Sequence, residues 1–221
     1  MTTQAKYVAH MGERLGKRFD ELWKDLAWLN VKWAQYTELF CSNRGRVDLL
    51  NETAPVFFRI VQDTLLEDVL LHVARLTEHS RPKGRNEKLT IHTLPALVDV
   101  RIRNRVSYAV KIAQQKATTC LDWRHRHIAH RNVALALKEA KPLEPITLQY
   151  VRDALAAIAV VLNEVHKQYV ESEIGFGTPG RAGGAVELLY VVNDGLKAAE
   201  DREKRLHSGD IRREDWARRK I

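Results

Sequence analysis

The chain has 221 residues, of which 45% are apolar and 29% are charged, and this length fits one domain with a small appendage. No run of about 18 apolar residues occurs, so we expect no membrane span, and the first residues lack the apolar segment of a secretory signal. The only cysteines, Cys41 and Cys120, exclude a disulfide framework and a four-thiolate zinc site. We therefore expect a cytoplasmic protein with reduced thiols.

The net charge of +8 is concentrated in one block of the sequence. Residues 81–131 contain 12 Lys and Arg against 3 Asp and Glu, a net charge of +9, whereas residues 1–80 carry −1 and residues 132–221 carry zero. A concentrated positive block attracts phosphate groups, unless the fold spreads the charges over different faces. The charge pattern favours RNA or a nucleotide as partner.

Apolar residues at helical spacing predict a first long helix that ends in the polar turn at residues 42–45. Its buried face consists of Leu22, Leu26, Leu29, Trp33 and Tyr36. Trp23 and Trp28 widen this face, and we expect both to pack in the core.

A second long helix is predicted from Thr53 to Leu76, with Thr53 as its N-cap and Pro55 in its first turn. A short helical lead-in is expected over residues 46–52. The second helix is apolar on most sides, so we expect it to be central and buried.

Asp68, His72 and Arg75 lie on one face of this second helix, at positions i, i+4 and i+7. Charged groups in an apolar helix need partners. A structural ion network is the favoured interpretation, and support of a functional site is the alternative.

The remaining sequence alternates polar loops with amphipathic segments. Loops are predicted at 79–90 and 138–147, a turn or short helix at 90–98, and helices at 101–120, at 185–206 and in a long segment capped by Thr147. The apolar stripe of the long segment consists of Val151, Leu155, Ile158, Leu162, Val165 and Tyr169. The predicted fold is therefore an all-α helical bundle built around long antiparallel helices, with a C-terminal helical extension.

Gly175, Gly177 and Gly180 spell G-x-G-x-x-G, but a dinucleotide site needs a preceding strand, and a helix precedes them here. We interpret this segment as a linker. The predicted domains are a helical bundle over 1–171, a Gly-rich linker over 172–184, and a C-terminal helix with a charged tail over 185–221.

The stretch LDWRHRHIAHRN, residues 121–132, closes the positive block and holds three His and three Arg. A metal site could use Asp122, His125, His127 and His130, but the neighbouring arginines disfavour a divalent cation, so we expect no metal and no other cofactor. Cys120 shows no context of an activated nucleophile, and we expect a buried helix residue.

Phosphodiester chemistry fits this stretch better than metal binding. Histidine transfers protons near neutral pH, and the planar guanidinium of arginine binds two phosphate oxygens at once. On a regular helix, the six residues from Arg124 to His130 advance about 600°, which leaves the two side chains about 120° apart. Either the stretch begins in a turn that leads into a helix, or two chains contribute to one site across a twofold axis.

The segment RHRHIAH, Arg124 to His130, resembles the motif of the HEPN superfamily. In that motif an Arg is followed directly by a polar residue, and four to six positions separate the Arg from a His. Together with ELWKDLAWLNVKW and the predicted second helix, it resembles the HEPN branch named after the abortive-infection U system, over roughly residues 15–170. This resemblance implies an all-α homodimer with facing motifs. It also implies a metal-independent endoribonuclease used as a toxin or in antiviral defence, with RNA as substrate and an antitoxin protein as a candidate partner.

The resemblance assigns phosphate binding and charge stabilisation to Arg124, proton transfer to His130 and a supporting polar role to His125. From charge and position alone, Arg126, His127 and Arg131 are candidate substrate-binding residues, although each could simply face solvent. Some HEPN domains are not catalytic. The alternative function is therefore a helical module that binds RNA, a nucleotide or an acidic protein without turnover.

Overall fold

The computed structural model describes residues 2–79, 88–130, 132–176 and 183–216. These residues form helices and no strand, which confirms the all-α prediction. In the same part of the chain, no helix combines the length and the apolar composition that crossing a membrane requires.

The helices group into two compact units. In chain order the elements are α1 (Thr3–Met11), α2 (Glu13–Phe40), α3 (Arg44–Thr53), α4 (Pro55–Thr77), the 3-10 turn η1 (Ile91–Thr93), α5 (Val100–Lys116), α6 (Thr118–Trp123), the π-helical turn η2 (Arg124–Ile128), α7 (Val133–Ala136), α8 (Leu148–Val170), α9 (Ala185–Ser208) and α10 (Arg213–Trp216). Unit 1 comprises Met1–Trp33 and Thr64–Thr178, and unit 2 comprises Ala34–Asp63 and Pro179–Ile221. The predicted domain division stays a prediction, because residues 177–182 of the expected linker lie outside the described residues.

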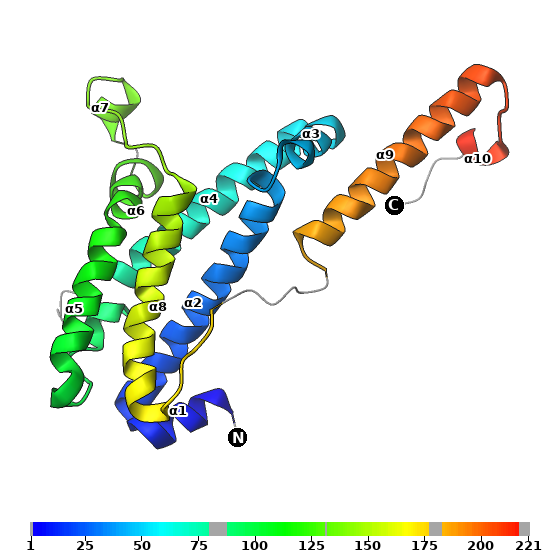
Figure 1. Ribbon diagram of the computed structural model, residues 1–221. Coiled ribbons are helices and arrows are strands. Elements are labelled where there is room, and N and C mark those ends of the chain that lie inside the picture. The colour runs from blue at the N-terminus through cyan, green and yellow to red at the C-terminus, as the bar shows by residue number, and fades with distance from the viewer. Residues whose placement is uncertain (1, 80–87, 131, 177–182, 217–221) are drawn as a thin grey trace. The chain divides into compact units, whose positions relative to one another are not determined.

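Antiparallel helices α5 and α8 pack side by side in unit 1 (Figure 1). Asp99 caps α5 by accepting a hydrogen bond from the Arg101 backbone N–H at 2.8 Å. The hydroxyl of Tyr169, in the last turn of α8, accepts from the Asp99 backbone N–H at 2.9 Å and ties these two helix ends together. Thr147 caps α8 as predicted.

The apolar faces predicted for α2 and α8 are confirmed, except that Tyr169 is only partly buried. Their members Leu22, Leu26, Leu29, Trp33, Tyr36, Val151, Leu155, Ile158, Leu162 and Val165 are all buried. Of the two tryptophans expected in the core, Trp23 is only partly buried, and Trp28 is a correction, since its side chain is 54% exposed. It lies on α2 one residue before the buried Leu29, about 100° around the helix from it, and therefore faces outward.

The N-terminal helix α1 is an element that the sequence did not reveal. Its Tyr7 packs edge-on against Phe19 of α2, with ring centroids 4.8 Å apart, and Phe19 in turn stacks on His166 of α8. Gly16 permits this approach, because a Cβ at this position would lie 2.7 Å from the backbone of Tyr7 and Val8. The backbone of α1 therefore occupies the space that a side chain at position 16 would need.

Helix α4 differs from its prediction in two ways. Thr53 ends α3 and donates its hydroxyl to the Leu49 carbonyl, so it does not cap α4, which begins at Pro55 after the extended Ala54. The C-terminal half of α4 is buried as expected, but its first turns expose apolar side chains. These are Val56, Phe57 and Ile60.

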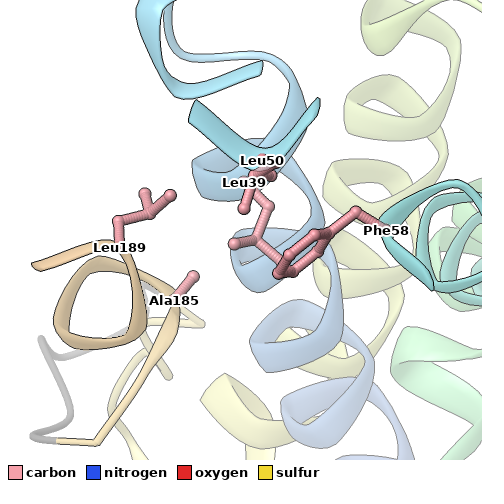
Figure 2. Close-up of a cluster of buried hydrophobic side chains, with 5 residues drawn as sticks. All are labelled: Leu39, Leu50, Phe58, Ala185 and Leu189. Carbon is pink, nitrogen blue, oxygen red and sulfur yellow. The ribbon is translucent and has the colours of Figure 1, made fainter. Parts of the chain in front are cut away.

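A small apolar cluster holds unit 2 together (Figure 2). It joins the end of α2, helix α3, the start of α4 and the start of α9 through Leu39, Leu50, Phe58, Ala185 and Leu189. The backbone N–H of Ala185 also donates to the side-chain oxygen of Gln35 at 2.6 Å. Helix α9 is thus fastened within unit 2 by its first turns.

Candidate active site

The motif stretch ends a helix. Helix α6 continues directly into the π-helical turn η2, which is closed by a hydrogen bond of 2.9 Å from the Ala129 backbone N–H to the Arg124 carbonyl. The chain leaves the helix at Ala129 and His130. We expected either a turn that leads into a helix or a site built by two chains. The structure shows the reverse of the first alternative, since here a helix leads into a turn. Single π-helical turns are rare in proteins, but those that occur are often found at functional sites.

Arg124 forms an ion pair that sequence reasoning missed. Its Nη1 donates to Oε1 of Glu78, the residue that follows α4, at 2.9 Å. The other carboxylate oxygen of Glu78 accepts from Nζ of Lys88 at 2.9 Å. Glu78 thus lies between two cations of the positive block. In the sequence, the signal for this ion pair was an acidic residue at the end of a helix expected to be buried.

The pKa of Glu78 reflects two opposing influences. Partial burial raises the pKa of this carboxyl, but the hydrogen bond from Lys88 and the charge of Arg124 outweigh burial, so the pKa lies below its usual value. The carboxylate form is therefore the one that holds Lys88 and Arg124.

His125 completes this cluster, which we call the Arg124 cluster (Glu78, Lys88, Arg124 and His125). Its Nε2 lies 2.8 Å from Nη1 of Arg124 and 4.0 Å from the carboxylate of Glu78. A guanidinium can only donate, so the short contact is a hydrogen bond only when Nε2 of His125 carries no proton. In that state the imidazole is neutral, as a proton acceptor must be.

A cleft of about 570 Å³ opens beside the Arg124 cluster. Arg124, Glu78 and Lys88 line it together with apolar side chains and with Arg75, whose guanidinium pairs with Asp25 of α2 at 3.1 Å. The lining holds three cationic side chains against the two carboxylates of Asp25 and Glu78. A phosphate-bearing ligand can bind there by taking the place of a carboxylate at one of these cations.

The predicted network on α4 is divided between two partners. Asp68 pairs with Lys32 of α2 at 2.6 Å and lies 3.3 Å from the His72 ring, so these two residues form part of the predicted ion network. Arg75 instead pairs with Asp25 and lines the cleft.

Arg126 and His127 lie in a different place from Arg124. Arg126 pairs with Asp122 at 3.2 Å and donates to the Lys141 carbonyl at 2.9 Å. The ring of His127 packs edge-on against Trp123, with centroids 5.4 Å apart. Both line a separate hollow of about 350 Å³. The turn η2 therefore directs two like-charged arginines to two different anionic partners, which relieves their mutual repulsion.

His130 is exposed, and within the described residues no hydrogen bond or ion pair joins it to Arg124 or His125. Arg131 lies outside the described residues. The structure thus brings Arg124 and His125 together in one chain. The roles predicted for all six basic residues stay predictions.

Two other chemistries would need a reactive thiol or a cluster of metal ligands. Cys120 is fully buried, and burial raises the pKa of its thiol to about 11, which opposes formation of a reactive thiolate. The described residues contain no group of three or more His, Cys, Asp or Glu side chains that could hold a metal ion.

Replacing Glu78 with Gln should lower the free energy of unfolding by about 1–2 kcal/mol at pH 7, because Arg124 and Lys88 lose a half-buried anionic partner. The folded pKa of Glu78 is lowered, so its stabilisation is fully present above the unfolded pKa of about 4.3 and disappears as the pH falls through the folded pKa. Urea denaturation of both proteins from pH 7 to pH 3 measures this difference.

The matched control for this prediction is Glu13→Gln, which removes an exposed ion pair with Lys17 within one helix. A smaller loss is expected there, because solvent screens exposed pairs. A difference between wild type and Glu78→Gln that grows as the pH falls would contradict the assignment.

Comparison with known families gives a match over most of the chain. The family model of the HEPN family AbiU2 matches residues 12–178, which include α2 to α8 and the whole Arg124 cluster. No curated protein and no solved structure shows significant similarity to the chain.

Proposed function

This chain belongs to the AbiU2 family of HEPN domains, and from that premise we propose that it is a metal-independent endoribonuclease of toxin or phage-defence type that acts as a homodimer. The observation that carries the proposal is the Arg124 cluster. A guanidinium and an imidazole nitrogen lie 2.8 Å apart beside a cleft that is also lined by Arg75 and Lys88. A phosphate with an adjacent hydroxyl proton to remove is the substrate that this pair suits.

The proposed reaction is attack of the RNA 2′-oxygen on the neighbouring phosphorus. A histidine removes the 2′-hydroxyl proton, the P–O5′ bond breaks, and a second proton donor protonates the departing 5′-oxygen. The products are a 2′,3′-cyclic phosphate and a 5′-hydroxyl. His130 is proposed as the main proton-transfer group, His125 as a supporting residue, and Arg124 as the stabiliser of the charge on the phosphate oxygens.

Glu78 has a defined place in this proposal. Carboxylates and phosphates bind the guanidinium in the same planar, two-oxygen manner, so an RNA phosphate can replace Glu78 as the partner of Arg124. Lys88 remains available to hold the released carboxylate. Glu78 then keeps the charged group of Arg124 in place before RNA binds.

The test is an RNA cleavage assay with purified wild-type protein on single-stranded and structured RNA, with and without EDTA. We expect cleavage that EDTA does not reduce and fragments that end in 2′,3′-cyclic phosphate. A His207→Ala protein, which changes an exposed histidine of α9, serves as the matched control and should cleave like wild type. Loss of activity in EDTA that zinc restores would contradict the mechanism. Salt-sensitive RNA binding without any shortening would favour the non-catalytic binding module.

A further inference from the structure

The hollow beside Arg126 and His127 is built differently from the cleft at Arg124. Its volume is about 350 Å³, and its walls are mostly apolar and aromatic. It is lined by Trp123, Arg126, His127, Asn132, Pro142 and Leu143, among others. The lining thus combines two ring side chains of the motif region with the segment that follows it.

Hydrogen bonds hold this hollow in shape. Nε1 of Trp123 donates to the Glu144 carbonyl at 2.7 Å, and Arg126 donates to the Lys141 carbonyl at 2.9 Å. Asn132 caps α7 by accepting from the Leu135 backbone N–H at 3.0 Å. The side chains of Trp123 and Arg126 are therefore held in place before any ligand arrives, which favours binding because they have little freedom left to lose.

The charge in the hollow is already balanced. The guanidinium of Arg126 is engaged by Asp122 and by the Lys141 carbonyl, so this residue positions the segment around 141. Within the described part of the chain, the Asn132 amide nitrogen and the ring nitrogens of His127 have no hydrogen-bond partner. A flat, largely apolar ligand with polar groups on its edge matches these features.

We propose that this hollow is a nucleobase subsite, which takes one base of the single-stranded RNA whose phosphate binds at Arg124. The rings of Trp123 and His127 are inclined by 79°, so a base can stack on one ring while the other borders its edge. Asn132 and His127 then meet the polar edge of the base. Unstacked bases that lie on aromatic side chains are the usual mode of single-strand recognition.

The cleft and the hollow meet at one short element, because Arg124 lines the cleft and His127 lines the hollow. Arg124 and His127 belong to the same five-residue turn, and a helix with its side chains is about 10 Å wide. A single RNA strand that crosses η2 can therefore place a phosphate in the cleft at Arg124 and a base from a nearby nucleotide in the hollow at His127. This inference rests on the proposed function for the identity of the ligand.

The experiment compares 2′-O-methyl RNA hexamers, which cannot be cleaved because the 2′-oxygen is blocked, with abasic hexamers of equal charge. Fluorescence anisotropy should show that wild-type protein binds the base-containing hexamer about 10-fold more tightly. Trp123→Leu and His127→Ala should each bring this ratio close to one and leave binding of the abasic hexamer unchanged. His127 is exposed, so its replacement tests the subsite even if Trp123→Leu loosens the segment near 144.

Tyr108→Ala is the matched control, because Tyr108 is a strongly exposed aromatic residue on α5, outside the hollow. Its ratio should equal that of wild type. A wild-type ratio near one, or an unchanged ratio in both subsite variants, overturns the inference. Cleavage of RNA together with an unchanged ratio would overturn the subsite alone, whereas an altered ratio without any cleavage would leave the subsite standing and refute the endoribonuclease.

Discussion

Mixed dimers of one Arg124→Ala chain and one His130→Ala chain are expected to regain about half of the wild-type RNA cleavage. Dimers of either variant alone are expected to cleave RNA about 100- to 1000-fold more slowly than wild type. Arg124 and His130 show no contact within the described residues of one chain. If one chain supplies Arg124 and its partner supplies His130, a mixed dimer keeps one of its two sites complete. Two purification tags isolate the mixed dimer for the assay.

The loss in Arg124→Ala must be separated from damage to the fold, because Arg124 also holds Glu78 at 2.9 Å. Glu78→Gln removes the charge of the same ion pair and leaves the guanidinium in place. If Arg124 acts on the RNA phosphate, Glu78→Gln should keep cleavage within about 10-fold of wild type, and Arg124→Lys should not rescue the two-oxygen contact. Equal losses in Arg124→Ala and Glu78→Gln would indicate a structural role.

A mixed dimer that is as inactive as the two parent dimers would contradict the two-chain site. In that case each chain would have to complete its own site, by moving the exposed His130 toward Arg124. The experiment thus decides between a site built by two chains and a site completed within one chain.

The sequence predicts most of the helices because their apolar periodicity is strong. Leu22 and Leu26 on α2, and Val151 and Ile158 on α8, repeat at helical spacing and are fully buried. Helix α1 escapes prediction because nine residues are too few to be stable alone, so packing of Tyr7 decides its existence.

The candidate site is less predictable than the fold. Local sequence identifies Arg124 and His125, since they stand in a motif. Glu78 is 46 residues away from Arg124, and only the packing of the folded chain brings the two together. The π-helical form of η2 also depends on one hydrogen bond, from the Ala129 backbone N–H to the Arg124 carbonyl. Periodicity carries no information on either feature.

The largest expected effect on stability comes from a position with no side chain. Gly16→Ala should lower the free energy of unfolding by about 2–4 kcal/mol, because the new Cβ would lie 2.7 Å from the backbone of Tyr7 and Val8, and backbone cannot move aside as a flexible side chain can. The loss has a ceiling. The protein can release α1 instead of unfolding, and it then loses only the burial of Tyr7 and Met11, which stabilises by about 1.5–3 kcal/mol for each side chain. The conformational entropy that the released helix regains offsets part of this loss.

Gly195→Ala in α9 is the matched control, because a Cβ there would meet nothing within 4 Å. It should stabilise unit 2 by about 0.5–1 kcal/mol, the usual advantage of Ala over Gly inside a helix. Urea denaturation followed by circular dichroism measures both variants. A stabilising Gly16→Ala would mean that α1 does not dock against α2 in solution.

The sign of the Gly16→Ala effect should reverse when α1 is already released. Ala9→Pro breaks α1 at an exposed position, since proline clashes with the preceding turn and removes a hydrogen-bond donor, and it leaves the core residues unchanged. In that background no backbone lies against position 16, and only the intrinsic preference of α2 for Ala remains. Gly16→Ala should then stabilise by about 0.5–1 kcal/mol. A purely local defect in α2 predicts the same destabilisation in both backgrounds, so the two explanations differ in sign and not merely in size.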